Sequence, residues 1–250
     1  MRGKFEGEDS FIEAQPASER RAVADIWAMR ASLELSVSAG YAIIVRELLE
    51  NGADKIVLEH CCWAASEEIE HAQICLDLAE RLDGKKRDWP RPASLHVPAY
   101  QGVGTGPLLA ALHLVAMSCL NETIACARLL EAMRPTKSPS IKHALRAILS
   151  DEIKHARAGW AHLASVHVSV LMKRQIAEFI PHIIRESLIS LIEENAAIPT
   201  QDYLAFGLPS VNDARTHAHQ AISDIVVPGF VKLGVPIDRE RALQMLAVPL

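Results

Sequence analysis

Hydrophobic side chains recur every three or four positions along most of this 250-residue chain, which is the spacing of an amphipathic α-helix. Groups of Pro, Gly and Asn interrupt this pattern near residue 51, over residues 83–106 and near residue 137. No segment gives a convincing strand pattern, so we predict an all-α fold. The predicted helices span residues 18–50, 54–82, 107–133, 140–168, 171–197 and 211–225, with a short helix over 239–247.

The connections between the helices predict how the first four pack. Short loops near residues 51 and 137 make two antiparallel hairpins, and the connection over 83–106 is long enough to run back along a helix of about 45 Å. Two hairpins joined by one long crossover make a four-helix bundle. We therefore predict an N-terminal tail over 1–17, a four-helix bundle over 18–168 and a C-terminal helical extension over 169–250 that packs on the bundle.

Two prolines modify the expected extension. Pro181 falls inside the helix predicted over 171–197 and is expected to break or bend it. From Pro228 onwards we expect irregular structure apart from the short helix over 239–247.

Composition and charge narrow the class of protein. Half of the residues are hydrophobic but only 5% are aromatic, which suits long packed helices rich in Ala, Leu, Ile and Val. The net charge of −5 argues against nucleic acid and acidic lipid as partners. An acidic N-terminus, the lack of an apolar run as long as a membrane span, and an odd number of cysteines (five) without zinc-type spacing favour a cytoplasmic protein with free thiols and no membrane partner.

Candidate chemistry begins with two Glu-x-x-His pairs, Glu68 with His71 and Glu152 with His155. Positions i and i+3 of a helix share a face, so each pair can direct a carboxylate and an imidazole at one point. The motif is short and occurs by chance, so the pairs alone predict little. Each pair nevertheless lies on an otherwise largely apolar stripe of its helix, which indicates that it points into the bundle.

Two further glutamates complete a symmetric set. In an antiparallel hairpin, residues at equal distance from the loop lie side by side. The midpoint of 34 and 68 is 51, and the midpoint of 122 and 152 is 137, so each midpoint falls in a predicted loop. We therefore expect Glu34 to face Glu68, and Glu122 to face Glu152.

Four carboxylates that converge in an apolar interior need compensating cations, because an isolated buried charge is costly. Two divalent metal ions would supply four positive charges, and carboxylate and imidazole ligands suit iron or manganese. Asp151 and Glu67 each precede a Glu-x-x-His pair, and either is a candidate acceptor for the second ring N–H of a ligating His. Arg30, one turn before Glu34, is expected to pair with an acidic neighbour rather than bind a substrate carboxylate.

With these residues, the sequence over about 20–168 resembles the ferritin-like di-iron carboxylate superfamily, which includes ferritins, rubrerythrins and the di-iron oxygenases and oxidases. The resemblance implies a ferritin-like bundle that binds two iron ions, or iron together with manganese. The implied metal ligands are Glu34, Glu68, His71, Glu122, Glu152 and His155.

Departures from individual branches leave the reaction open. The arylamine N-oxygenase branch has a His where this chain has Ile148, and ribonucleotide reductase small subunits have a radical Tyr where it has Cys75. Rubrerythrins usually add a rubredoxin-like domain with four Cys, which this sequence does not supply, and ferritins lack a C-terminal extension of this length.

From this resemblance we expect an oxidase or oxygenase that activates O₂, acts on a small organic substrate, takes electrons from a donor and forms a homodimer. The alternative is a ferroxidase, a peroxide scavenger or an iron-storage subunit. A third reading is a structural or partner-binding helical protein that holds no metal, in which Glu68→Ala changes no chemistry.

Overall fold

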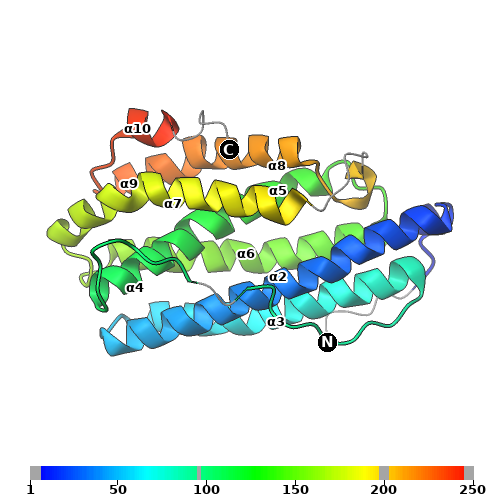
Figure 1. Cartoon of the computed structure of the whole chain (residues 1–250), viewed down its shortest axis with the longest axis horizontal. Helices are drawn as coiled ribbons and strands as arrows, with labels where there is room; N and C mark the ends of the chain where they lie inside the picture. Colours follow the sequence, from blue (N-terminus) through cyan, green and yellow to red (C-terminus); the bar gives the residue numbers. More distant parts are fainter. Residues whose placement is uncertain (1–6, 95–96, 197–202, 245–250) are drawn as a thin grey trace.

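The computed structural model describes residues 7–94, 97–196 and 203–244, and all the regular secondary structure in these residues is helical (Figure 1). The predicted all-α class is therefore confirmed. The long helices are α2 (Ala17–Glu50), α3 (Lys55–Asp83), the continuous run of α4 (Pro107–Leu114), π-helical η1 (Val115–Glu122) and α5 (Thr123–Met133), then α6 (Pro139–Ala164) and α7 (Val170–Ala196). The shorter elements are α1 (Ser10–Glu13), η2 (Leu204–Phe206), α8 (Val211–Ala221), π-helical η3 (Ile222–Val226), α9 (Val227–Lys232) and α10 (Arg239–Gln244).

Local sequence signals set the ends of the site-bearing helices. Ser138 caps α6, because its hydroxyl accepts a hydrogen bond from the amide of Ile141, and Pro139 occupies the first turn, where its missing N–H costs nothing. Gly84 ends α3 in the left-handed conformation, at φ 74°. α6 stops at Ala164 rather than at the predicted 168, because Ser165 is already extended.

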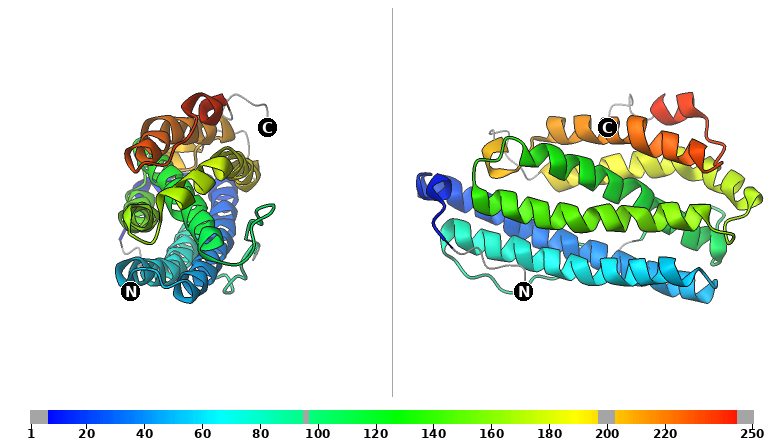
Figure 2. Two further views of the ribbon diagram at one scale, coloured as in Figure 1. Left: turned by 90° about the vertical axis from the view of Figure 1, so that its left-hand side faces the viewer. Right: turned by 180° about the vertical axis from the view of Figure 1, so that it is seen from behind.

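The first four long helical segments lie side by side (Figure 2). α2 packs along α3, α3 packs on α6, and α6 packs on η1 and α5. The crossover between α3 and α4 runs along α2, where the amide of Ala93 donates to the carbonyl of Ser32 and the amide of Ser94 donates to the hydroxyl of Ser36, each at 3.0 Å. The crossover is thus fastened to the outside of α2.

The C-terminal helices pack on the α4–η1–α5 run. α7 contacts α4 and η1, and α8 contacts α5 and α7. Trp160 of α6 packs against Phe230 of α9 in a tilted arrangement, with ring centroids 5.1 Å apart and an interplanar angle of 54°. α7 continues through Pro181 without ending.

Helical structure also continues past Pro228, where we predicted irregular structure; α8, η3 and α9 form one run that ends at Lys232. Pro228 is the second residue of α9, two residues after the end of the π-helical turn at Val226. The α-helical ladder is already interrupted there, so the missing N–H of proline is tolerated.

The N-terminal segment contains an anchored turn of helix. Asp9 is buried, and its carboxylate accepts hydrogen bonds from the Ile12 amide, the Ser138 hydroxyl and the Ser140 amide. One side chain therefore caps α1 and joins it to the start of α6.

By length and composition alone, two helical segments of the described chain, α2 and the α4–η1–α5 run, are apolar enough to cross a membrane. Buried helices of soluble proteins meet the same criterion. In the α4–η1–α5 run, 72% of the most apolar window is buried within the protein. In α2, 28% of the corresponding window is buried. This is weak evidence for a membrane span.

Candidate metal centre

Four helices bring the six predicted ligands together. Two groups form in which one ligand atom from each residue lies within 4.8 Å of every other. The first group is Glu34, Glu68, His71 and Glu152, and the second is Glu68, Glu122, Glu152 and His155. Glu68 and Glu152 belong to both groups, so they lie where carboxylates could bridge two ions. Five of the six side chains are buried, whereas Glu34 is half-buried.

The two imidazoles face this pair of carboxylates in the same way. Nδ1 of His71 lies 3.1 Å from Glu68 Oε2 and 3.5 Å from Glu152 Oε1. Nδ1 of His155 lies 3.0 Å from Glu68 Oε1 and 3.1 Å from Glu152 Oε2. Both rings therefore direct Nδ1 inward, and Nε2 is left to face acids outside the cluster.

The acids outside the cluster are Glu67 and Asp151. Each one faces Nε2 of the histidine on the other helix. His155 Nε2 lies 2.9 Å from Glu67 Oε2, and His71 Nε2 lies 3.4 Å from Asp151 Oδ2. Lys154 joins the two acids, since its Nζ lies 2.6 Å from Glu67 and 2.7 Å from Asp151. A carboxylate that accepts from Nε2–H keeps the proton there and leaves Nδ1 as the donor atom for a metal.

The π-helical segment η1 places Glu122, its last residue, against the cluster. The hydroxyl of Tyr41 donates to Glu122 Oε1 at 2.9 Å, and Tyr41 is fully buried. One turn earlier, the hydroxyl of Ser118 donates to the carbonyl of His155 and accepts from the amide of Gly159 at 3.0 Å. π-helical turns are often found at functional sites, and this one is clamped to α6 beside a candidate ligand.

In the absence of metal, protons and imidazolium charge compensate the carboxylates. Burial and the neighbouring Glu68 raise the pKa of Glu34 to about 8, and burial and Glu152 raise that of Glu122 well above its usual value. Burial opposes ionisation of Glu68 too, but His71 and His155 outweigh it and lower the pKa of Glu68 to about 2.

The histidines show the complementary shift. Burial disfavours the imidazolium, but Glu68 and Asp151 raise the pKa of His71 to about 12. The same balance, with the nearby carboxylates of Glu152 and Glu68, raises the pKa of His155 to about 11. Two imidazolium ions thus occupy the electrostatic role that cations would take in the same cluster.

The residues present fit a pair of metal ions. Glu68 Oε1 is buried and accepts no hydrogen bond, although His155 Nδ1 lies 3.0 Å away. A buried carboxylate oxygen without a donor is costly, and a metal ion at that position would satisfy it. Carboxylates and imidazoles together suit iron or manganese. The protein therefore has Glu and His groups close enough to hold a metal ion.

Several residues at the site were not predicted. Lys154 and Ser118 received no role from the sequence. Lys154 lies inside a Glu-x-x-His motif, which was the available signal; the contacts of Ser118 depend on the π-helical turn, which no sequence period reveals. Arg30 was expected to pair with an acidic neighbour: its charge favours the ionised form of Glu34, although no ion pair within 4.0 Å joins Arg30 to an acid in the described part of the chain.

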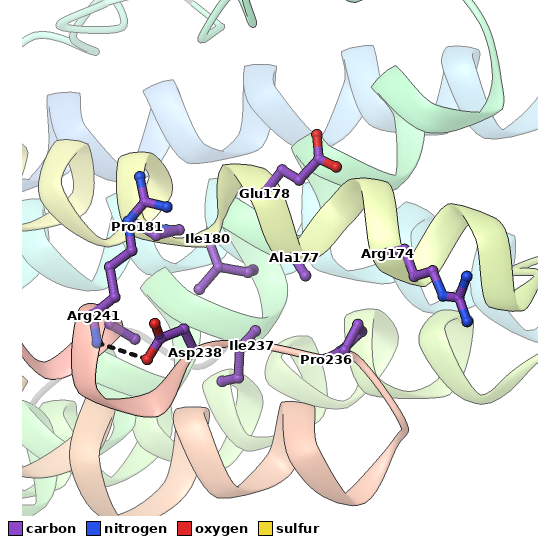
Figure 3. Close-up of a pocket in the computed structure, with 10 residues that line it drawn as sticks. Arg174, Ala177, Glu178, Ile180, Pro181, Pro236, Ile237, Asp238 and Arg241 are labelled. Carbon is purple, nitrogen blue, oxygen red and sulfur yellow. Dashed lines mark hydrogen bonds between the residues drawn. The ribbon is translucent and has the colours of Figure 1, made fainter.

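A surface hollow of about 290 Å³ lies elsewhere, between α7 and the segment that leads into α10 (Figure 3). None of the six candidate ligands lines it. Figure 3 shows Arg174 and Arg241 at opposite ends, with Asp238 accepting from the backbone amide of Arg241 at 3.1 Å. Glu178 and Asp238 offset these two cations, so the hollow has no convergent charge that would define a ligand.

Comparisons of the chain with protein-family models, with curated proteins and with solved structures each found no match. Support for a function therefore comes from the geometry of the carboxylate and histidine cluster.

Proposed function

We propose that this chain is a ferritin-like di-iron carboxylate protein and that it acts as an O₂-activating oxidase or oxygenase on a small organic substrate. The two overlapping Glu/His groups, which share Glu68 and Glu152, are the observation that supports this best. A site with two shared carboxylates, two single carboxylates and two Nδ1 donors has the composition of the di-iron sites found in four-helix bundles. Bound iron would supply the capacity to bind and reduce O₂.

The residues of the chain have separate roles in this proposal. Glu34 and His71 would hold one ion and Glu122 and His155 the other, and Glu68 and Glu152, which belong to both groups, would serve both. Asp151 and Glu67 keep the outer proton on the two imidazoles. Tyr41 orients Glu122 by donating to its carboxylate. The buried surroundings exclude water and strengthen each of these interactions.

The C-terminal helices support an enzyme over a storage subunit. α7 and α8 cover the α4–η1–α5 run, which carries Glu122, so the outer face of this helix is occupied by the chain's own extension. The alternative, a ferroxidase, peroxide scavenger or iron-storage subunit, remains the second outcome of the experiments below. In that case iron or peroxide, rather than an organic molecule, would be the substrate.

Metal content is the first test. Wild-type protein from iron-replete medium is expected to contain close to two irons per chain by elemental analysis, and Glu68→Ala/Glu152→Ala is expected to lose them. Glu70→Ala is the matched control, because Glu70 is exposed on the same helix two residues from Glu68. A wild-type protein that takes up no metal after anaerobic loading with iron(II) would show that the proposal is wrong.

Two further measurements separate the enzyme from its alternative. The iron(II)-loaded protein is expected to consume O₂ faster than the same amount of free iron(II), and light scattering is expected to give a small oligomer. A large cage, or rapid consumption of peroxide without any organic substrate, would favour the iron-handling alternative.

A further inference from the structure

Glu47 of α2 and His113 of α4 form a buried pair outside the candidate metal centre. Glu47 lies 13 residues after Glu34 on α2, which is about 20 Å along the helix axis. His113 Nδ1 lies 2.7 Å from Glu47 Oε2, and His113 Nε2 lies 2.8 Å from the carbonyl oxygen of Pro98. One imidazole therefore joins α2, α4 and residues 97–104 of the crossover, which we call the crossover segment.

The two partners of the His113 ring decide how many protons the pair must hold. An ionised carboxylate and a backbone carbonyl only accept hydrogen bonds, and a neutral imidazole has a single N–H to donate. Both contacts are therefore hydrogen bonds only when the pair holds one additional proton. Transfer of that proton from Nδ1 to Glu47 leaves the count unchanged. Loss of the proton leaves either Glu47 or the Pro98 carbonyl facing a ring nitrogen that donates nothing.

Three other titratable groups lie around this pair. From the crossover segment, the Tyr100 ring packs on the His113 ring, with centroids 5.6 Å apart. Burial, with Glu186 and Glu47 nearby, raises the pKa of Tyr100 above its usual value, so its hydroxyl stays protonated. From α7, the exposed His182 lies 6.1 Å from the Tyr100 ring and pairs with Glu186 at 3.9 Å. On its other side, α4 packs in an apolar cluster to which α6 also contributes.

We propose that Glu47 and His113 form a pH-sensitive latch that holds the crossover segment on α2 and α4 at mildly acidic pH and releases it as the pH rises. Histidine is the side chain that ordinarily changes charge between about pH 5 and 8. The closed segment holds the additional proton and the released segment does not, so closure is favoured at low pH and is lost as the pH rises. Release uncovers the surface on which Tyr100 packs, including Phe179 of α7, whose ring centroid lies 5.6 Å away. This inference does not depend on the proposed function.

Two glutamine variants separate a latch from a pair that only cross-links the helices. In Glu47→Gln, the side-chain amide can donate to Nδ1 of a neutral imidazole while Nε2–H donates to Pro98, so both contacts form without the additional proton. The crossover segment of this variant is expected to stay closed at every pH. In His113→Gln, a single amide replaces the ring that spans both acceptors, so the segment is expected to be released at every pH. A structural cross-link predicts instead that both variants loosen the segment.

The test is hydrogen–deuterium exchange of the full chain at pH 6 and pH 8, measured by mass spectrometry and corrected for the intrinsic effect of pH on exchange. In wild type, peptides from the crossover segment are expected to exchange roughly tenfold faster at pH 8, because one charge-assisted hydrogen bond is lost. Peptides from α3 and α6 in the same samples report any change in global stability. His167→Gln is the matched control, since His167 forms a more exposed pair with Asp54, at 3.0 Å, and should leave the response of the segment unchanged.

The outcomes decide for or against the latch. A pH response confined to the crossover segment in wild type, together with closure at both pH values in Glu47→Gln, would support it. Equal corrected exchange rates at pH 6 and pH 8 in wild type, or a wild-type response retained in Glu47→Gln or His113→Gln, would overturn it. If His113→Gln does not fold, wild type and Glu47→Gln still give the decision.

Discussion

Glu67 of α3 accepts a hydrogen bond from His155 of α6, at 2.9 Å, and not from His71 on its own helix. Asp151 of α6 has the reciprocal relationship with His71 of α3, at 3.4 Å. The reason is geometric: with Nδ1 turned toward Glu68 and Glu152, each ring directs Nε2 away from its own backbone and toward the adjacent helix. The two helices are therefore coupled through the same residues that orient the candidate ligands.

This crossed pairing predicts which ion each outer acid affects. Glu67→Ala is expected to weaken the ion held with His155, and Asp151→Ala the ion held with His71, each by roughly 10–100-fold. The measurement is a stepwise titration with cobalt(II). The exposed Glu70→Ala change should have no effect.

Double-mutant cycles test the crossing itself. The effects of Glu67→Ala and His155→Ala on cobalt(II) affinity should be non-additive, because the two residues share one interaction. The effects of Glu67→Ala and His71→Ala on the same affinity should be nearly additive. The reverse pattern would contradict the crossed arrangement and restore pairing within each helix.

Stability of the metal-free protein is expected to fall as pH rises from 6.5 to 8. His71 and His155 have folded-state pKa values of about 12 and 11, against 6.5 for the model imidazole, so the folded state binds more protons than the unfolded state throughout this range. Glu34, with its pKa raised to about 8, adds to the same trend. Urea unfolding of chelator-treated protein at several pH values measures the effect.

The metal-loaded protein is expected to behave in the opposite way over the same range. Metal binding displaces the protons from the ligands, so affinity for the metal rises with pH and the bound metal stabilises the folded state.

The metal-free protein should also lose stability below about pH 4.5, because Glu68, with its pKa lowered to about 2, is ionised in the folded state and protonated in the unfolded chain. Metal-free stability that increased from pH 6.5 to 8 would contradict this distribution of protons.

Anchoring of the N-terminal segment gives a prediction about stability alone. Asp9→Ala removes the acceptor for the Ile12 and Ser140 amides and the Ser138 hydroxyl, so it is expected to lower the free energy of unfolding by about 1–3 kcal/mol. Glu8→Ala, at an exposed neighbouring position, is the control. Iron content should stay unchanged, since α1 contributes no candidate ligand.

The sequence predicted the helices well because their signals are local. The hydrophobic period and the turn residues placed the ends of α2, α3 and the α4–η1–α5 run within about two residues. The midpoint argument used only helix geometry and loop position, and the structure does bring Glu34 near Glu68 and Glu122 near Glu152. These properties depend on neighbours along one hairpin.

Features that depend on contact between hairpins were harder to predict. Which histidine directs its Nε2 at Glu67 and which at Asp151 depends on how α3 and α6 pack together. The residue spacing within one helix cannot reveal this. The π-helical turns of η1 and η3 leave no hydrophobic period of their own, so Glu122 was assigned correctly to its helix while its support by Ser118 was missed.

The closeness of η1 and α6 depends on Gly159. A Cβ atom at this position would lie 2.6 Å from Cys119 Sγ and 2.9 Å from Ser118 Cβ, both shorter than any normal contact. Gly159→Ala must therefore move η1 away from α6, with an expected loss of about 1–3 kcal/mol in the free energy of unfolding. Because η1 carries Glu122, the same displacement should weaken metal binding, as measured by cobalt(II) titration. Gly104→Ala is the matched control, since a Cβ there meets no atom within 4 Å. If Gly159→Ala lowered stability but left both ions bound as tightly as in wild type, the contact would support the fold without positioning Glu122.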